Sequence, residues 1–217
     1  MLQPSVIAAI PSVFAKWEGD GLPYMYTDSK GIVTCATGNA LFSAAAAEAL
    51  SWYGPSGFIC SKSEVDAAYA TVKGAWPKVQ STACARLTNI RLNHAGIVAL
   101  VMRTVQTDWA YLLTQFQGCE GFPADAQLAL LSSAWAWGSG FARVWGDLGT
   151  KFKSLLSSPP QFVFAAQTML DASVHEESIN PGIVPRDRAE VIMFQNAGAV
   201  AAAGADYSVL WYPKEYA

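Results

Sequence analysis

The segment from Ala124 to Trp137 most strongly constrains the fold of this chain, because apolar and small residues occupy nearly every side of the predicted helix. A helix of that kind has almost no face to present to water, so other elements must surround it. Hydrophobic residues form 52% of the 217 residues and charged residues only 14%, which supplies the apolar surface for such a core. The sequence therefore predicts a folded protein with a central buried helix.

Further helices are predicted by apolar residues at helical spacing and by capping residues at helix starts. The clearest caps are Asn93 and the pair Ser61 and Glu64, which has the capping-box spacing. Pro11 interrupts the first helix, and Gly19 follows its expected end. These signals place helices at 4–17, 43–52, from 61 onward, 94–116, 124–137, 159–170 and 185–203.

A different pattern follows the first helix. Residues 24–27 and 32–35 are strand-like, and the four residues between them begin with Asp28 and end with Gly31, as type I turns prefer. We therefore predict a small β-hairpin near the N-terminus. The expected fold class is α+β and predominantly helical. No repeat or linker divides the sequence, so we expect a single domain over residues 1–217.

Charge and hydropathy exclude two classes of partner. The net charge is −3 and no Lys/Arg cluster is dense, which argues against a nucleic-acid partner. No run reaches the roughly 20 apolar residues of a membrane span, and the N-terminus lacks the features of a signal peptide. We expect a protein made in the cytoplasm, which would act outside it only with the help of lysis or secretion machinery.

The cysteine and histidine residues have no metal-ligand spacing, so neither a metal nor another cofactor is expected. The cysteines either form disulfides, in one of three pairings, or stay reduced as small buried side chains. Among the aromatic residues, those beside Gly or Pro are candidates for exposed surfaces that stack on sugars, whereas Trp135 and Trp137 are expected in the core. The four cysteines are Cys35, Cys60, Cys84 and Cys119, and the four aromatic candidates are Trp52, Tyr53, Trp211 and Tyr212.

Three residues around the hairpin suggest a chemistry. Glu18 ends the first helix beside Trp17, where partial desolvation favours a protonated carboxyl. Asp28 lies at a turn, where solvent favours the charged form, and Thr34 across the hairpin has a hydroxyl that can orient water. Two carboxyls in such different environments are what glycosidic cleavage requires.

This segment resembles the phage-type lysozymes, glycoside hydrolase family 24. The family spaces its triad as Glu, eight residues, Asp or Cys, five residues, Thr. Here nine residues separate Glu18 from Asp28 and five separate Asp28 from Thr34, and the additional residue falls within 20–23. Tyr26, Gly31 and Gly38 also match hairpin positions of the family.

The C-terminal half extends the resemblance, which covers about 1–41 and 93–200 and leaves 42–92 as a divergent or enlarged middle segment. Gln127–Gly138 resembles the family's central helix, and 184–189 resembles its Pro-x-Arg-Ala element, whose Arg pairs with the catalytic Glu. By position Arg188 is the better match, with Arg186 as the alternative. The chain departs from the family at Asn39, where His is usual, at Ala136, where Asn or Gln is usual, and in its acidic charge.

The resemblance implies a lysozyme-like fold and a muramidase that hydrolyses the MurNAc–GlcNAc β-1,4 bond of peptidoglycan, as an endolysin or an antibacterial effector. Glu18 would be the acid, held by Arg188, and Asp28 with Thr34 would activate water. An inverting course puts the two carboxyls about 6.5–9.5 Å apart. The implied protein is a cofactor-free monomer whose partners are glycan strands and, for an effector, an inhibitor or immunity protein. Two alternatives stay open: a non-catalytic cell-wall-binding module and a chitin or chitosan hydrolase.

Overall fold

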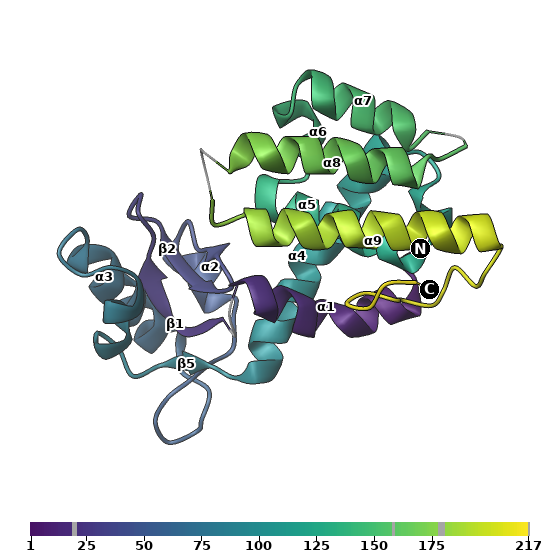
Figure 1. Cartoon of the computed structure of the whole chain (residues 1–217). Coiled ribbons are helices and arrows are strands. Elements are labelled where there is room, and N and C mark those ends of the chain that lie inside the picture. The colour runs from purple at the N-terminus through teal and green to yellow at the C-terminus, as the bar shows by residue number, and fades with distance from the viewer. Residues whose placement is uncertain (19–20, 158, 178–180, 217) are drawn as a thin grey trace. The chain divides into compact units, whose positions relative to one another are not determined.

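The computed structural model describes residues 1–18, 21–157, 159–177 and 181–216. This part of the chain is mostly helical and has a small antiparallel sheet, which confirms the predicted α+β class (Figure 1). The chain forms two compact units. We call Pro11–Arg103 the hairpin unit, and Met1–Ile10 together with Thr104–Ala217 the helical unit. A single lysozyme-like domain over the whole chain stays a prediction.

Two long helices contribute residues to both units, α1 (Pro4–Glu18) and α4 (His94–Gln115). Both were predicted, and α1 continues past Pro11 to its end at Glu18, while Gly19 lies outside the described residues. Asn93 caps α4 as expected, since its Oδ1 accepts the Gly96 N–H at 2.8 Å. The hairpin unit further contains β1 (Leu22–Thr27), β2 (Val33–Ala36), β3 (Asn39–Ala40), α2 (Ala44–Glu48), β4 (Trp52–Tyr53), α3 (Lys62–Ala75), η1 (Ser81–Arg86) and β5 (Arg91–Leu92).

The predicted hairpin is confirmed. Strands β1 and β2 are antiparallel, with Tyr26 opposite Thr34 and Thr27 opposite Val33, and β3 pairs with the other edge of β2. Helix α3 lies beside this sheet (Figure 1). The core between them contains Met25, Val33, Cys35, Val65, Ala68 and Val72. The sheet therefore has one face covered by α3 within its own unit.

The predicted helix over 43–52 is confirmed only in its first half. Ser43 caps α2, but the helix ends at Glu48, and Trp52 pairs with Leu92 in a two-stranded ribbon. The Trp52 side chain is fully buried, and its indole N–H donates to the Ala47 carbonyl at 2.9 Å. Trp52 therefore cannot be an exposed surface for sugar stacking. The predicted capping box that starts α3, formed by Ser61 and Glu64, is present.

The helical unit is built around α5 (Ala124–Trp137), as its sequence predicts. Every residue from Ala124 to Ala134 is buried, whereas Trp135 and Trp137 are only partly buried. Helix α9 packs against both α5 and α8, and Figure 1 shows α8 and α9 side by side. The other elements of this unit are η2 (Cys119–Gly121), α6 (Phe141–Val144), α7 (Asp147–Leu155), α8 (Phe162–Glu176) and α9 (Val184–Ala203).

One buried carboxylate on α5 fixes the C-terminal segment. Asp125 accepts the backbone N–H groups of Trp211 and Tyr212 and the side-chain amide of Asn196, each at 2.9 Å. These bonds hold Tyr212 in a buried position and leave Trp211 partly buried. The expectation of exposure was therefore wrong for Tyr212, because the sequence gives no sign of the contact with α5.

Candidate active site

Asp28 is held by hydrogen bonds within its own turn. Its Oδ1 accepts the backbone N–H groups of Lys30 and Ile32, each at 2.8 Å. The Gly31 N–H donates to the Asp28 carbonyl at 3.1 Å, which closes the predicted turn. The carboxylate is therefore fixed at the end of the hairpin by backbone donors from residues close to it in sequence.

Tyr26 and Thr34 lie on one face of the hairpin because they are directly opposite each other in the β1–β2 register. The Thr34 hydroxyl donates to the Ile32 carbonyl at 3.1 Å, so its oxygen can still accept a hydrogen bond. Thr34 is 4% exposed, and Tyr26 is partly buried beside it. This face brings two of the predicted site residues together.

Glu18 is the last residue of α1 and is exposed, while Trp17 beside it is partly buried. The ammonium of Lys16 lies 4.8 Å from the centre of the Trp17 ring. The indole therefore has a cationic neighbour from its own helix. Of the loop 20–23 that should absorb the additional residue, Asp20 lies outside the described residues, and Leu22 and Pro23 belong to strand β1 and not to a loop.

The pKa of the Tyr26 phenol depends on charged groups that include Glu18 and Asp28. Burial raises the pKa of the Tyr26 phenol above its usual value, and the negative charges of Asp28 and Glu18 raise it further. A hydrogen bond from the Gly38 backbone acts in the opposite direction. The phenol is thus within electrostatic reach of both predicted catalytic carboxylates and opposite Thr34.

The two predicted supporting residues next to this face lie at the second turn of the sheet. Gly38 is exposed and has a φ of +91°, a backbone conformation that favours glycine. Asn39 is partly buried on β3, where it pairs with Cys35. Gly38 therefore has both a conformational reason for being glycine and a contact with Tyr26.

The two candidate arginines belong to the helical unit and differ in exposure. Arg188 lies 3.8 Å from Glu177, in an ion pair whose side chains are both largely exposed. Arg186 is buried, with 7% of its surface accessible. The pairing of either guanidinium with Glu18 stays a prediction.

Besides Asp125, two further carboxyls that the sequence did not single out have raised pKa values. Burial raises the pKa of Asp108 on α4 to about 6. Burial also raises the pKa of Glu190, which is fully buried on α9, to about 8, although the Ser132 and Ser133 hydroxyls oppose the shift. Neither could be found from sequence, because both shifts depend on how helices pack.

Comparison with protein-family models, curated proteins and solved structures finds no match for this chain. Over the described residues, no group of three or more His, Cys, Asp or Glu side chains is placed to hold a metal ion. In the same part of the chain, no helix has the length and apolarity needed to cross a membrane. The four cysteines, all of them described, are free thiols.

Proposed function

We propose that the protein is a lysozyme-like glycoside hydrolase that cuts the MurNAc–GlcNAc β-1,4 bond of peptidoglycan. The observation that carries the proposal is the position of Tyr26. Its phenol is within electrostatic reach of Glu18 and Asp28, and its strand position faces Thr34. Two of the three residues that match the lysozyme triad thus influence the pKa of Tyr26, and the third lies opposite it, which supports the proposal.

In this proposal Glu18 protonates the glycosidic oxygen while Asp28 and Thr34 position the attacking water. The backbone N–H groups of Lys30 and Ile32 fix the Asp28 carboxylate, and the Thr34 oxygen offers a further acceptor for water. Glu18 is exposed here, so a bound sugar would have to exclude water from its carboxyl for the acid to be effective. The inverting course requires a carboxyl separation of about 6.5–9.5 Å.

The resemblance assigns the guanidinium that holds Glu18 to Arg188, with Arg186 as the alternative. A positioning role needs a side chain with little freedom. Arg188 is exposed and pairs with Glu177, whereas Arg186 is buried. The proposal keeps Arg188 as the assigned partner and Arg186 as the alternative.

A second candidate function is a non-catalytic module that binds cell-wall glycan. Two observations favour it: Glu18 is exposed, and the Asp28 carboxylate serves its own turn. Exposure of the carboxyl and hydrogen bonding within a turn are both found in carboxylates with a purely structural role, so neither feature requires catalysis.

Purified peptidoglycan incubated with the protein distinguishes the two functions. A muramidase releases soluble fragments with muramic-acid reducing ends, which mass spectrometry identifies. A binding module sediments with the sacculi and releases nothing. The same assay on chitosan tests the remaining glycosidase alternative, and cleavage of chitosan alone would move the substrate assignment to that polymer.

A further inference from the structure

The C-terminal end of α3 contacts the turn that carries Asp28. The Lys73 ammonium donates to the Gly31 carbonyl, with Nζ 2.9 Å from the oxygen. Gly31 is the fourth residue of that turn, and its own N–H donates to the Asp28 carbonyl at 3.1 Å. A series of hydrogen bonds therefore connects α3 to the backbone of Asp28, although Lys73 follows Gly31 by 42 positions in the sequence.

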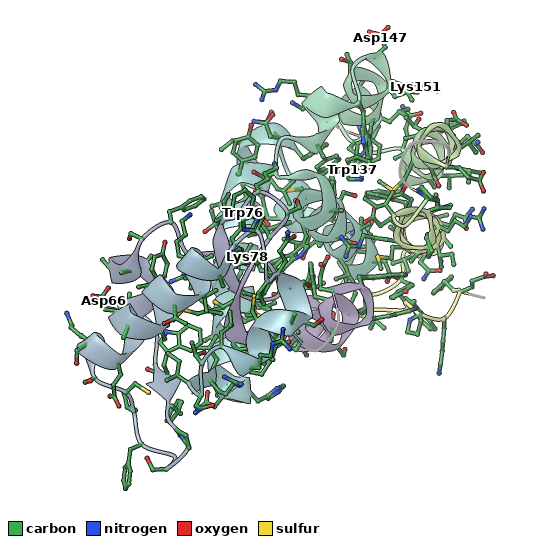
Figure 2. The ribbon with its side chains drawn as sticks, turned by 90° about the vertical axis from the view of Figure 1, so that its left-hand side faces the viewer. Asp66, Trp76, Lys78, Trp137, Asp147 and Lys151 are labelled. Atoms are coloured by element: carbon green, nitrogen blue, oxygen red, sulfur yellow. The ribbon has the colours of Figure 1, made fainter. Side chains whose placement is uncertain are left out.

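Trp76 packs against the same glycine. A Cβ atom placed on Gly31 would lie 2.9 Å from Cδ2 and 3.0 Å from Cε2 of the Trp76 ring. These atoms form the bond shared by the two indole rings, so the ring lies directly against the glycine. Gly31 also has a φ of +74°, which other residues adopt at a cost. The close approach and the backbone conformation both require glycine at this position. Figure 2 labels Trp76 just beyond the end of α3, the helix that carries Asp66.

These contacts reach the hairpin from the side opposite Tyr26. Side chains alternate between the faces of a strand, so Thr27 and Val33 lie on the other face from Tyr26 and Thr34. Val33 packs in the core with residues of α3, and the Thr27 hydroxyl donates to the Val79 carbonyl at 3.2 Å. A helix on that side can hold the turn without occupying the face where Tyr26 and Thr34 lie.

We infer that Lys73 and Trp76 are positioning residues for Asp28, an inference that rests on the proposed function. The turn residues Ser29 and Lys30 are exposed, and short exposed turns open readily. Catalysis requires the carboxylate to keep one orientation, because misplacement by about 1 Å can cost roughly 10²-fold in rate. The middle segment 42–92, which contains α3, thus supplies a support for the site.

The test compares Lys73→Met and Trp76→Ala with Lys73→Arg, which keeps a donor. Lys62→Met is the matched control, since Lys62 is on the same helix but lies 3.6 Å from Glu48 and is largely exposed. The first measurement is amide hydrogen exchange at Ile32, whose N–H donates to Asp28. We expect about tenfold faster exchange in Lys73→Met and Trp76→Ala, because a tenfold change corresponds to the net free energy of about one hydrogen bond. Exchange in Lys73→Arg and Lys62→Met should equal that of the wild type.

The second measurement is kcat and KM on a soluble peptidoglycan oligosaccharide. Lys73→Met should lower kcat with KM unchanged, and Lys73→Arg should restore kcat, because the substrate contacts remain while the carboxylate loses its fixed position. Unchanged exchange at Ile32 in Lys73→Met, or an equal effect of Lys62→Met, would overturn the inference. Faster exchange with wild-type kcat would also overturn it. A wild-type protein without hydrolytic activity would refute the proposed function instead, while the exchange data would still test the contact.

Discussion

The carboxylate Oδ1 of Asp28 lies 2.8 Å from the backbone nitrogen of Ile32. This bond makes Asp28 part of the hairpin as well as part of the proposed site. A loss of activity on mutation therefore has two explanations, a missing catalytic group or a disturbed turn. Variants that keep or remove the acceptor oxygen separate the two.

Asp28→Asn should keep the turn and lose hydrolysis. The amide oxygen can still accept the N–H groups of Lys30 and Ile32, so the free energy of unfolding should change by less than about 1 kcal/mol. Asp28→Ala removes the acceptor and should cost about 1–2 kcal/mol. Both variants should lose at least about 10²-fold in fragment release. Urea unfolding and the peptidoglycan assay measure these effects, and an active Asp28→Asn protein would rule out Asp28 as the water-activating group.

The cysteines should behave as four thiols of unequal reactivity. Burial raises the pKa of Cys35 and of Cys119 to about 12, and Cys84 is fully buried, whereas Cys60 is partly exposed. A chromogenic disulfide reagent at pH 8 should therefore label one thiol rapidly in the native protein and four after denaturation. Fewer than four thiols after denaturation without reductant would show that a disulfide forms.

Glu190 should make the protein less stable as the pH rises. Its folded-state pKa of about 8 exceeds the ordinary value of 4.5, so the folded state keeps a proton that the unfolded state releases. The free energy of unfolding should thus fall as the pH rises from about 4.5 to about 8. Below that range both states hold the proton, so this group causes no change there. The groups that shift the pKa beside burial are Ser132, Ser133, Arg186 and Asp187.

Glu190→Gln should remove this dependence, because the amide stays neutral and can still bond with Ser133, whose hydroxyl lies 2.7 Å from the carboxyl. The difference in unfolding free energy between the variant and wild type should increase from pH 5 to pH 8 by a few kcal/mol, on the order of 1.4 kcal/mol per pH unit. Asp108 is present in both proteins, so its own titration cancels. A difference that stays constant with pH would contradict a raised Glu190 pKa.

Two glycine substitutions should have opposite effects on stability. A Cβ on Gly149, in α7, would overlap the Ala142 carbonyl, so Gly149→Ala should destabilise by about 1–3 kcal/mol. Gly74, in α3, has open space around it, so Gly74→Ala should stabilise by about 0.4–1 kcal/mol. Thermal unfolding of both variants tests whether Gly149 of α7 lies against the Ala142 carbonyl. Equal changes in stability in the two variants would contradict this packing.

Features determined by local sequence were predictable. The apolar composition of α5 predicts its burial, Asn93 and Ser61 mark helix starts, and Asp28 with Gly31 predicts the turn. Each signal lies within the element that it predicts.

The features that were missed depend on contacts between segments far apart in sequence. Trp52 is buried because its strand pairs with Leu92, and the pKa of Glu190 reflects burial of α9 against α5. Lys73 reaches Gly31 only because α3 packs beside the hairpin. At the candidate site, the order of Glu18, Asp28 and Thr34 was readable from sequence. The exposure of Glu18 was not, because it depends on how the end of α1 packs.

The most direct test of the proposed function is mass analysis of fragments released from purified peptidoglycan by wild type, Glu18→Gln and Glu48→Gln. Glu48 is the matched control, since its ion pair with Lys62 at the surface contributes little to stability. The proposal predicts muramic-acid reducing ends from wild type and Glu48→Gln, and a loss of about 10²–10⁴-fold in Glu18→Gln with unchanged folding. Equal release by wild type and Glu18→Gln would contradict the assignment of Glu18 as the acid, and no release by any of the three would contradict a muramidase.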